Sequence, residues 1–290
     1  MNKMTPQMRR NTHSHLYSWL FIGDFVLKFL CCLLITVSAF AEIRTIHSLH
    51  EISTDGFSAQ TLVMLDLDGV LIYPQDALMQ NWRSDWKPEG VRAWTAEEDT
   101  ITWMNLKFQI MDPTGPQFVD TLYEHGIPTI GFTAFAMDQA GIVESIPKWR
   151  SQHLKELGLN FKGEKEVIFP IQKGFLPASF EKGVLYCGDF YKKDKDNKGK
   201  ILSLYLDWLD WTPEQVVLVD DDKKHLESVQ RELARRTIPF LGFLYIPKDL
   251  DPIDEKVGEL QYKTIINQKL WLSDWQAKKL LTTDPSIISD

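Results

Sequence analysis

Asp66 and Asp68 stand two residues apart, where the apolar run TLVML (61–65) meets Gly69. Side chains two apart in an extended strand share a side, and a glycine directly behind them lets the backbone turn sharply. Two carboxylates at a strand end can divide the work of phosphoryl transfer, because one can attack phosphorus while the other moves protons. The alternative for each aspartate is an ordinary solvated strand end.

Four further polar residues lie at or near the ends of other apolar runs: Thr133, Lys198, Asp220 and Asp221. In an open parallel sheet, ligands bind beyond the carboxyl ends of the strands, so these side chains are expected to converge with the first two aspartates. Converging carboxylates repel one another, and a Mg²⁺ ion relieves the repulsion because it takes two or three protein oxygens and completes its shell with water and phosphate. With the positive charge of Lys198, the set predicts a site for a phosphoryl group.

The elements that must position these residues alternate along the chain. Apolar runs of strand length are separated by segments of helical period, which is typical of an α/β fold with a central parallel sheet covered on both faces. The expected strands are 61–66, 127–132, 183–188, 215–220 and 239–246. The expected helices lie within 114–126, 147–160, 198–211, 222–236 and 267–281. No repeat or long linker divides the chain, so one domain is expected.

Two intervals are longer than a strand–helix–strand crossover needs. The first, about 72–112, holds Trp82, Trp86, Trp94 and Trp103. The second, about 160–182, contains KEVIFPI, a candidate for an additional strand. Either insertion could overhang the strand ends and shape a pocket, although packing within a small inserted subdomain is the favoured role of the tryptophans. Without a large, clearly separate cap, the site would be fairly open and would accept varied or bulky phosphoesters.

Residues 1–41 differ in composition from the rest of the chain. Several basic residues precede the apolar run FLCCLLITVSAFA (29–41), whose small-x-small end predicts a signal peptide cleaved before Glu42. A retained membrane anchor is the alternative, but Asp24 and Lys28 interrupt the apolar stretch, and the clean run is shorter than the ~20 residues that span a bilayer. The expected product is a single domain, 42–290, in the periplasm or secreted.

The 290-residue chain has a formal net charge of −8 at pH 7. Loss of residues 1–41 would remove four basic and one acidic side chain and change this charge to −11. An acidic mature protein argues against nucleic acid or anionic membrane surfaces as partners, and a small-molecule or protein phosphoester is expected instead. Cleavage would also remove Cys31 and Cys32, so that Cys187 remains alone and no intramolecular disulfide forms.

Four stretches, in order, resemble the motifs of the haloacid dehalogenase (HAD) superfamily: LVMLDLDGVL (62–71), PTIGFT (128–133), NKGKIL (197–202) and VVLVDDD (216–222). The resemblance implies a HAD-like Rossmannoid three-layer fold and phosphatase activity. It also implies that Asp66 is the nucleophile that becomes an aspartyl-phosphate and that Asp68 is the general acid and base. Thr133 is implied to hydrogen-bond the phosphoryl oxygens, and Lys198 to neutralise the nucleophile and the phosphate.

The same resemblance implies the metal ligands. Asp220 would hold Mg²⁺ together with the carboxylate of Asp66 and the backbone carbonyl of Asp68, and Asp221 would be a second acidic position that acts through water. An aspartate rather than a threonine two residues after the nucleophile favours hydrolysis over a long-lived phosphoenzyme.

Alternatives remain for several residues. Lys200 competes with Lys198, and helix capping accounts for one or two of the aspartates at 220–222, of which Asp222 is the one expected to cap. The residues just after Thr133 include no arginine, where many members of the superfamily have one, and His225 stands where a related pattern often has asparagine.

The expected function is that of a Mg²⁺-dependent phosphomonoester hydrolase acting through an aspartyl-phosphate. A phosphotransferase using the same intermediate is one alternative. A catalytically silent scaffold that binds a phosphorylated ligand or partner is the other.

Overall fold

A computed structural model describes residues 41–171, 175–188, 197–248 and 250–288, all within one compact unit, Ala41–Asp290. Apart from Ala41, the predicted signal peptide lies outside the described residues, and so do Cys31 and Cys32. In the described part of the chain, no helix has both the length and the apolar composition that a membrane span requires.

The centre of the unit is an eight-stranded sheet with the strand order β1-β10-β9-β2-β5-β8-β7-β6. Its parallel strands are β1 (Ala41–Ile46), β2 (Thr61–Leu65), β5 (Thr129–Thr133), β8 (Val184–Tyr186), β9 (Gln215–Asp220) and β10 (Phe240–Tyr245). Two short strands, β6 (Val167–Phe169) and β7 (Ala178–Glu181), extend one edge by antiparallel pairing. The chain visits β5 and β8 on one side of β2 before it crosses to β9 and β10 on the other, which makes the end of β2 a topological switch point.

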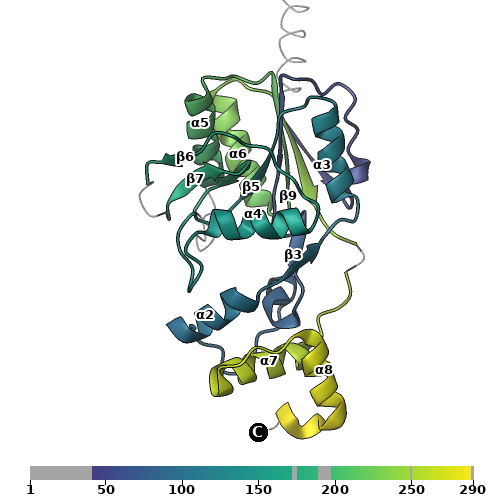
Figure 1. Ribbon diagram of the computed structural model, residues 1–290. Coiled ribbons are helices and arrows are strands. Elements are labelled where there is room, and N and C mark those ends of the chain that lie inside the picture. The colour runs from purple at the N-terminus through teal and green to yellow at the C-terminus, as the bar shows by residue number, and fades with distance from the viewer. Residues whose placement is uncertain (1–40, 172–174, 189–196, 249, 289–290) are drawn as a thin grey trace, which may run out of the picture. The chain divides into compact units, whose positions relative to one another are not determined.

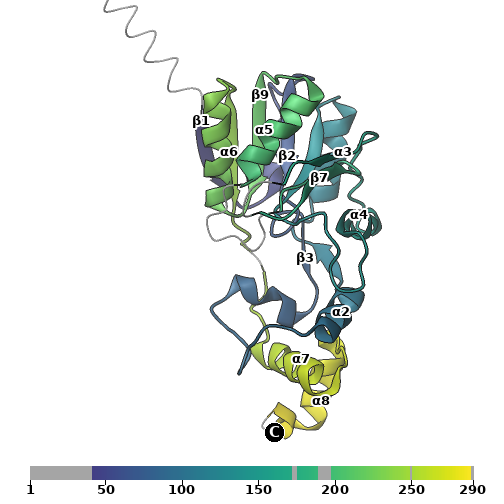
Figure 2. The same ribbon diagram turned by 90° about the vertical axis from the view of Figure 1, so that its left-hand side faces the viewer.

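Helices cover both faces of this sheet (Figures 1 and 2). One face carries η1 (Leu49–Glu51), α3 (Gly115–Glu124) and α4 (Ile146–Glu156), and the other carries α5 (Asn197–Leu209) and α6 (Lys223–Arg235). The prediction of an α/β fold with a mostly parallel central sheet flanked by helices is therefore confirmed.

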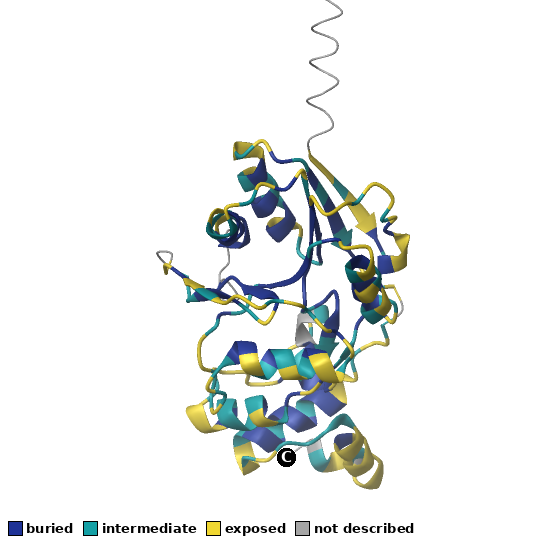
Figure 3. Ribbon diagram, turned by 45° about the horizontal axis from the view of Figure 1, so that its top comes forward, coloured by how far each residue is buried: buried dark blue, intermediate teal, exposed yellow. Residues whose placement is uncertain are grey.

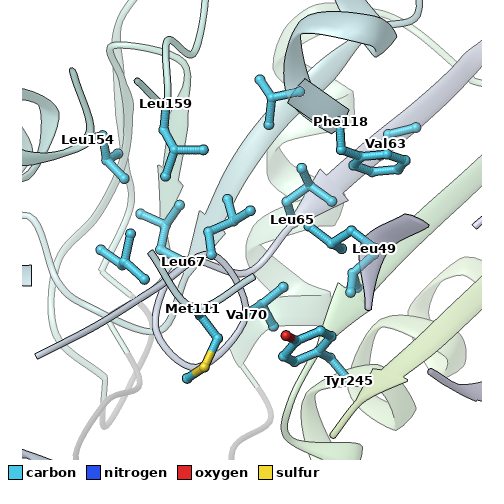
Figure 4. Close-up of a cluster of buried hydrophobic side chains, with 14 of the residues drawn as sticks. Leu49, Val63, Leu65, Leu67, Val70, Met111, Phe118, Leu154, Leu159 and Tyr245 are labelled. Atoms are coloured by element: carbon cyan, nitrogen blue, oxygen red, sulfur yellow. The ribbon is translucent and has the colours of Figure 1, made fainter. Parts of the chain in front are cut away.

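The alternation of side chains along β2 explains how one strand supports two cores. Val63 and Leu65 pack with α3 and α4, in a core that includes Phe118 and Leu154 (Figure 4). Leu62 and Met64 pack on the opposite face, with the apolar sides of α5 and α6. The whole of β2 is buried, as the dark strands at the centre of Figure 3 show, so a continuous apolar run is required at this position.

The structure extends the predicted set of elements at both edges of the sheet. β1 pairs in parallel with β10, and β6 forms within the KEVIFPI segment that was a strand candidate. The sequence prediction did not include β1, β7 or the small hairpin of β3 (Ile72–Pro74) and β4 (Phe108–Ile110). These strands are short or partly exposed, so they lack the long apolar runs by which the central strands were found.

The first insertion does not stand alone. Its elements η2 (Ala77–Arg83) and α2 (Ala96–Asn105) pack with α7 (Glu255–Gln268) and α8 (Asp274–Thr283), which precede η3 (Pro285–Ile288), and we call this group the helical lobe (Figure 1). The helix predicted within 267–281 is α8, which begins only at Asp274 because the chain turns at Lys269, where φ is positive at 56°. The sequence prediction did not include α7, of which only the last two residues fall within that segment.

Specific polar contacts join the insertion to the C-terminal helices across nearly two hundred residues of sequence. The backbone amide of Ala77 donates to Asp274 Oδ1 at 2.8 Å, and that of Leu78 donates to Gln261 Oε1 at 2.9 Å. Glu98, which is fully buried, accepts from Arg92 and from Lys269 Nζ at 2.7 Å. The second insertion is different, because it extends the sheet edge through β6 and β7.

Candidate functional site

The ends of β2 and β9 bring Asp66 and Asp220 together. Leu65 is paired with Val219 in the parallel register, and the backbone amide of Asp66 donates to the carbonyl of Val219 at 2.9 Å. Asp66 directly follows the last residue of β2, and Asp220 is the last residue of β9, so both lie at the carboxyl ends of central strands. Both side chains are buried, with Asp66 4% exposed and Asp220 fully enclosed.

Lys198, from the first turn of α5, lies between these two carboxylates. Its Nζ is 2.9 Å from Asp66 Oδ1 and 2.7 Å from Asp220 Oδ2, and it also donates to the backbone carbonyl of Phe132 at 3.1 Å. Lys198 is completely buried, whereas Lys200 is exposed and its Nζ lies over the ring of Phe175. Of the two lysines considered, Lys198 is therefore the one at the carboxylates.

Gly199 allows α5 to approach α6 closely enough to hold Lys198 in this place. Its backbone amide donates to Ser228 Oγ at 3.1 Å. A β-carbon at position 199 would lie 2.4 Å from the backbone oxygen of Ser228, so any larger residue would push the two helices apart. The pairing of a lysine with a following glycine thus has a packing reason.

Asp68 lies on the loop after β2 and meets residues from two other elements. Thr133, the last residue of β5, donates its hydroxyl to Asp68 Oδ2 at 3.2 Å. Arg150 Nη1, from α4, lies 3.0 Å from Asp68 Oδ1. The two oxygens of Asp68 are therefore held from different sides, while 29% of its side chain stays exposed.

Arg150 is a site residue that the sequence analysis did not identify. It is fully buried, and its guanidinium carbon lies 4.3 Å from the centre of the Phe108 ring and 4.9 Å from that of Phe135. Flat guanidinium groups stack well on aromatic rings, which fixes the direction of this side chain. A signal was present in the sequence, because Ile146, Arg150 and Leu154 are spaced by four and place an arginine in an apolar helical stripe.

The three aspartates at 220–222, at the end of β9, make different contacts. Asp220 Oδ1 accepts from the backbone amide of Asp222 at 2.9 Å and lies 3.2 Å from His225 Nδ1. The Asp222 side chain caps α6 by accepting from the amide of Lys224 at 2.9 Å, which confirms the predicted capping role.

Asp221 lies against the loop that carries Asp68. A β-carbon at Gly69 would come within 2.4 Å of Asp221 Oδ2, and Gly69 has a φ of +92°, so glycine is required there for space and for conformation. The predicted sharp turn behind the aspartate pair is confirmed by this φ.

The charges at the site are strongly coupled. Burial, followed by the repulsion of Asp220, raises the pKa of Asp66 well above that of an ordinary aspartate, although Lys198 acts in the opposite direction. Burial also acts to raise the pKa of Asp220, but Lys198 and His225 outweigh it and lower that pKa to about 2. Burial opposes the charged form of Lys198, yet the two aspartates raise its pKa above the usual lysine value.

The donor groups fit a hard divalent cation. Asp66, Asp220 and His225 each present a ligand atom, and these atoms lie within 4.8 Å of one another. Asp66 also experiences repulsion from Asp68 and Asp221, so four carboxylates share this region with Lys198 and Arg150. An additional positive charge bound by carboxylate oxygens would relieve that repulsion. The presence of His225 in this cluster was not predicted from the sequence.

The site opens into a cavity of about 470 Å³. At one end lie Asp66, Asp68, Thr133, Asp221 and His225. The other end is formed by the helical lobe, through residues that include Trp94, Trp103 and Tyr262, so the first insertion helps to shape a pocket beyond the strand ends. The lobe encloses it because α7 returns from the C-terminal part of the chain. The second insertion contributes no lining residue in its described part.

The tryptophans of the first insertion have different environments. Trp94 and Trp103 line the cavity, and Trp86 packs closely on Gly258 of α7. The side chain of Trp82 lies outside the described residues. Packing within the lobe therefore accounts for one of these tryptophans, and two of them also shape the cavity.

Residues 42–278 match a protein family described as "Protein of unknown function (DUF2608)". The chain belongs to this family. It is 23% identical to "Uncharacterized protein RP296" of Rickettsia prowazekii over 88% of this chain and 97% of the relative. It is 26% identical to a "Putative outer membrane protein" of Chlamydia muridarum over 83% of this chain and 90% of the relative. No solved structure matches the chain.

The family match contradicts the assignment to the HAD superfamily. The matching family is an uncharacterised one that spans nearly the whole described unit, and neither relative carries the name of a haloacid dehalogenase protein. The four short stretches that resembled HAD motifs cover few residues each, and strand ends with aspartates arise in many α/β folds. Function in this family must therefore be argued from the site itself.

Proposed function

We propose that this protein is a Mg²⁺-dependent phosphomonoester hydrolase that forms an aspartyl-phosphate on Asp66. The observation that carries the proposal is the position of Lys198, which lies within 3 Å of both Asp66 and Asp220 at the end of a parallel sheet that faces a cavity. Phosphoryl transfer depends mainly on positioning and charge neutralisation, and this arrangement can supply both.

In the first step, an Asp66 carboxylate oxygen attacks phosphorus and forms a new P–O bond. The bond from phosphorus to the leaving alcohol breaks, and Asp68, protonated at this stage, donates its proton to the departing oxygen. Lys198 holds Asp66 Oδ1 and the backbone amide of Leu67 donates to the same oxygen at 2.9 Å, so the carboxylate is oriented before the substrate arrives.

In the second step, Asp68 removes a proton from water as the water oxygen attacks phosphorus. The acyl-phosphate bond breaks, which releases phosphate and restores the Asp66 carboxylate. Thr133 supports Asp68 in both protonation states, because its hydroxyl donates to a carboxylate oxygen and can accept from a carboxylic acid.

Arg150 is a positioning residue in this scheme. It acts through Asp68 Oδ1, and the aromatic rings around it prevent the guanidinium from swinging away. Bound Mg²⁺ would supply charge neutralisation at the phosphoryl oxygens, and the residues proposed to hold it are Asp66, Asp220, Asp221 and the backbone carbonyl of Asp68.

Replacing Asp66 with asparagine tests the nucleophile. Wild-type protein should hydrolyse phenyl phosphate with Mg²⁺ and stop when a chelator is added, and acid quenching should trap phosphate on the protein. Asp66→Asn should show neither turnover nor trapped phosphate while its circular dichroism is unchanged. Asp68→Asn should keep trapped phosphate but release it slowly, because the water is no longer activated.

The outcomes separate the alternatives. Hydrolysis by Asp66→Asn at the wild-type rate would exclude the proposed nucleophile. Transfer of the phosphate to an added alcohol in preference to water would indicate a phosphotransferase. If the wild type hydrolyses none of a broad set of phosphate esters but still binds phosphate, the protein is a binding scaffold.

We further propose that the protein is exported, to the periplasm or outside the cell, and acts there on a phosphoester rather than on nucleic acid or a membrane surface. The signal-like segment before Glu42 and the name of the Chlamydia relative, "Putative outer membrane protein", support export, and the acidic charge disfavours polyanions. Cleavage before Glu42 would keep five of the six residues of β1 in place. N-terminal sequencing of the fractionated protein should begin at Glu42.

A further inference from the structure

The part of the cavity away from the carboxylates is apolar and belongs to the helical lobe. Its lining includes Leu78, Met79, Val91, Trp94 and Leu106. With about 470 Å³ in all, the cavity falls within the range of pockets that enclose small organic ligands, so it offers room for a sizeable group attached to a phosphate.

Two hydroxyl groups on this part of the wall, those of Tyr262 and Thr102, already bond to the protein. The Tyr262 hydroxyl donates to the carbonyl of Gly90 at 3.2 Å and accepts from the amide of Arg92 at 3.1 Å. The Thr102 hydroxyl donates to the carbonyl of Glu98 at 2.9 Å. A ligand hydroxyl that reached these two groups would therefore lose water without gaining an equivalent partner, whereas Asp99 on the same wall retains acceptor capacity.

Asp99 places a carboxylate at this end of the cavity, which disfavours negatively charged ligand groups there. Its Oδ1 accepts from the indole nitrogen of Trp103 at 3.1 Å, and both residues line the cavity. A second phosphate or a carboxylate on the ligand would approach this aspartate in a partly desolvated place, where like charges repel strongly.

We propose that the substrate is a phosphate monoester of an uncharged, apolar alcohol, aromatic or alkyl, whose organic group occupies the lobe end of the cavity. The inference rests on the proposed hydrolase function and specifies its substrate class. Sugar phosphates, nucleotides and diphosphates fit this wall poorly, because their polar groups would face apolar side chains and a carboxylate. An apolar group gains from burial against Val91, Trp94 and their neighbours.

Two pairs of esters test the substrate class, and the two members of each pair have the same type of leaving group. 4-Butylphenyl phosphate and phosphotyrosine both release a phenol, and butyl phosphate and glycerol phosphate both release an alkyl alcohol. The apolar member of each pair should have a kcat/KM about 10–100-fold higher, which is the discrimination that an apolar pocket commonly provides. Equal or higher kcat/KM for both polar members, in an active enzyme, would overturn the inference.

A binding measurement separates this inference from the hydrolase proposal. Benzylphosphonate and methylphosphonate are not hydrolysed, and calorimetric titration of the wild type should give about 10-fold tighter binding of benzylphosphonate. Val91→Asp places a charge on a side chain that is 53% exposed and lines the cavity, so folding should be unaffected. This variant should weaken benzylphosphonate about 10-fold and leave methylphosphonate unchanged.

Ile168→Asp is the matched control, because Ile168 is 65% exposed on β6 and does not line the cavity. It should change the affinity of neither phosphonate. If Val91→Asp weakens both phosphonates equally, or neither, the apolar end is not the binding site and the inference fails. If benzylphosphonate binds more tightly than methylphosphonate and Val91→Asp weakens only benzylphosphonate, while no ester is hydrolysed, then the hydrolase proposal fails and the apolar binding site stands.

Discussion

Lys198, Asp66 and Asp220 form a buried group in which each charge depends on the others. Removing water from any one of them alone would be strongly unfavourable, and the mutual contacts at 2.7 and 2.9 Å compensate for it. Asp66 nevertheless has a raised pKa, because Lys198 is shared with Asp220 and the surrounding carboxylates repel it. A carboxylate with a pKa raised in this way lowers the stability of the folded protein at neutral pH, and strongly shifted pKa values of this kind are typical of functional sites.

Arg150→Met tests the positioning role of the buried arginine. Without Arg150 the carboxylate of Asp68 is no longer oriented, so kcat should fall about 10–100-fold, with a smaller change in KM because Asp68 acts in the chemical steps. The measurement is steady-state hydrolysis of phenyl phosphate.

The Asp68→Asn background supplies the decisive comparison. If Arg150 works through Asp68, adding Arg150→Met to Asp68→Asn should produce little further loss. An equal loss in both backgrounds would show that Arg150 acts independently of Asp68. Lys182→Met removes an exposed ion pair with Glu166 and should leave kcat unchanged.

The close contact between α5 and α6 at Gly199 and Ser228 fixes the position of Lys198 in the site. Gly199→Ala would place a β-carbon 2.4 Å from the Ser228 backbone oxygen, and backbone cannot move aside as a side chain can. We expect the free energy of unfolding to fall by about 1–3 kcal/mol, as in other overpacked interiors, and the hydrolysis rate to fall because Lys198 shifts. Urea unfolding and kinetics measure the two effects.

Gly115→Ala, in α3, is the control for this substitution. The added β-carbon there would lie 3.3 Å from a methyl group of Leu71, which is a side chain that can adjust. Its effect on unfolding and on hydrolysis should be much smaller. Alanine favours a helix more than glycine does, so helix propensity alone would raise the stability of both variants. Similar losses for the two variants would therefore show that the α5–α6 contact is not the cause.

The helical lobe should lose stability in acid through Glu98. Arg92 is the main cause of the lowered pKa of this buried carboxylate, with Lys269 and Thr95 contributing. Because the folded pKa lies below the unfolded value near 4.5, the stabilisation is present above about pH 4.5 and is lost as the pH falls toward the folded pKa.

Glu98→Gln removes the titrating group from this arrangement. The variant should be less stable than the wild type at pH 7, and the difference between the two should shrink between pH 5 and pH 3. Urea unfolding at several pH values measures it. A difference that is constant over this range would show that Glu98 does not titrate as inferred.

For the whole molecule, Mg²⁺ should shift the folding equilibrium. An ion that binds the folded state alone stabilises it by about 1.4 kcal/mol at ten times its Kd, which corresponds to a rise in Tm of roughly 3–6 °C for a protein of this size. Thermal unfolding of the wild type with and without a chelator measures the shift. Asp220→Asn should abolish it, and a shift that persists in that variant would place the ion elsewhere.

Much of the central sheet could be predicted because the strands that form it are buried on both faces. β2 and β9 read as continuous apolar runs, and their polar ends identified Asp66 and Asp220 together with the turn at Gly69. Edge strands were missed because a partly exposed strand needs no such run, as the six residues of β1 show. Family membership was predicted wrongly, because residues 42–278 match a family of unknown function, and four short motifs at strand ends do not identify a superfamily.

By itself, the sequence determined the alternation of strands and helices, the acidic charge and the residues able to carry phosphoryl chemistry, since these depend on local pattern and composition. Only the tertiary structure decided that Arg150 reaches Asp68, that His225 joins Asp220, and that α7 returns to close the cavity with the first insertion. These contacts join positions 5 to 183 residues apart through packing of whole elements. A local sequence pattern does not predict such packing, because its free energy depends on the side chains of both elements that come into contact.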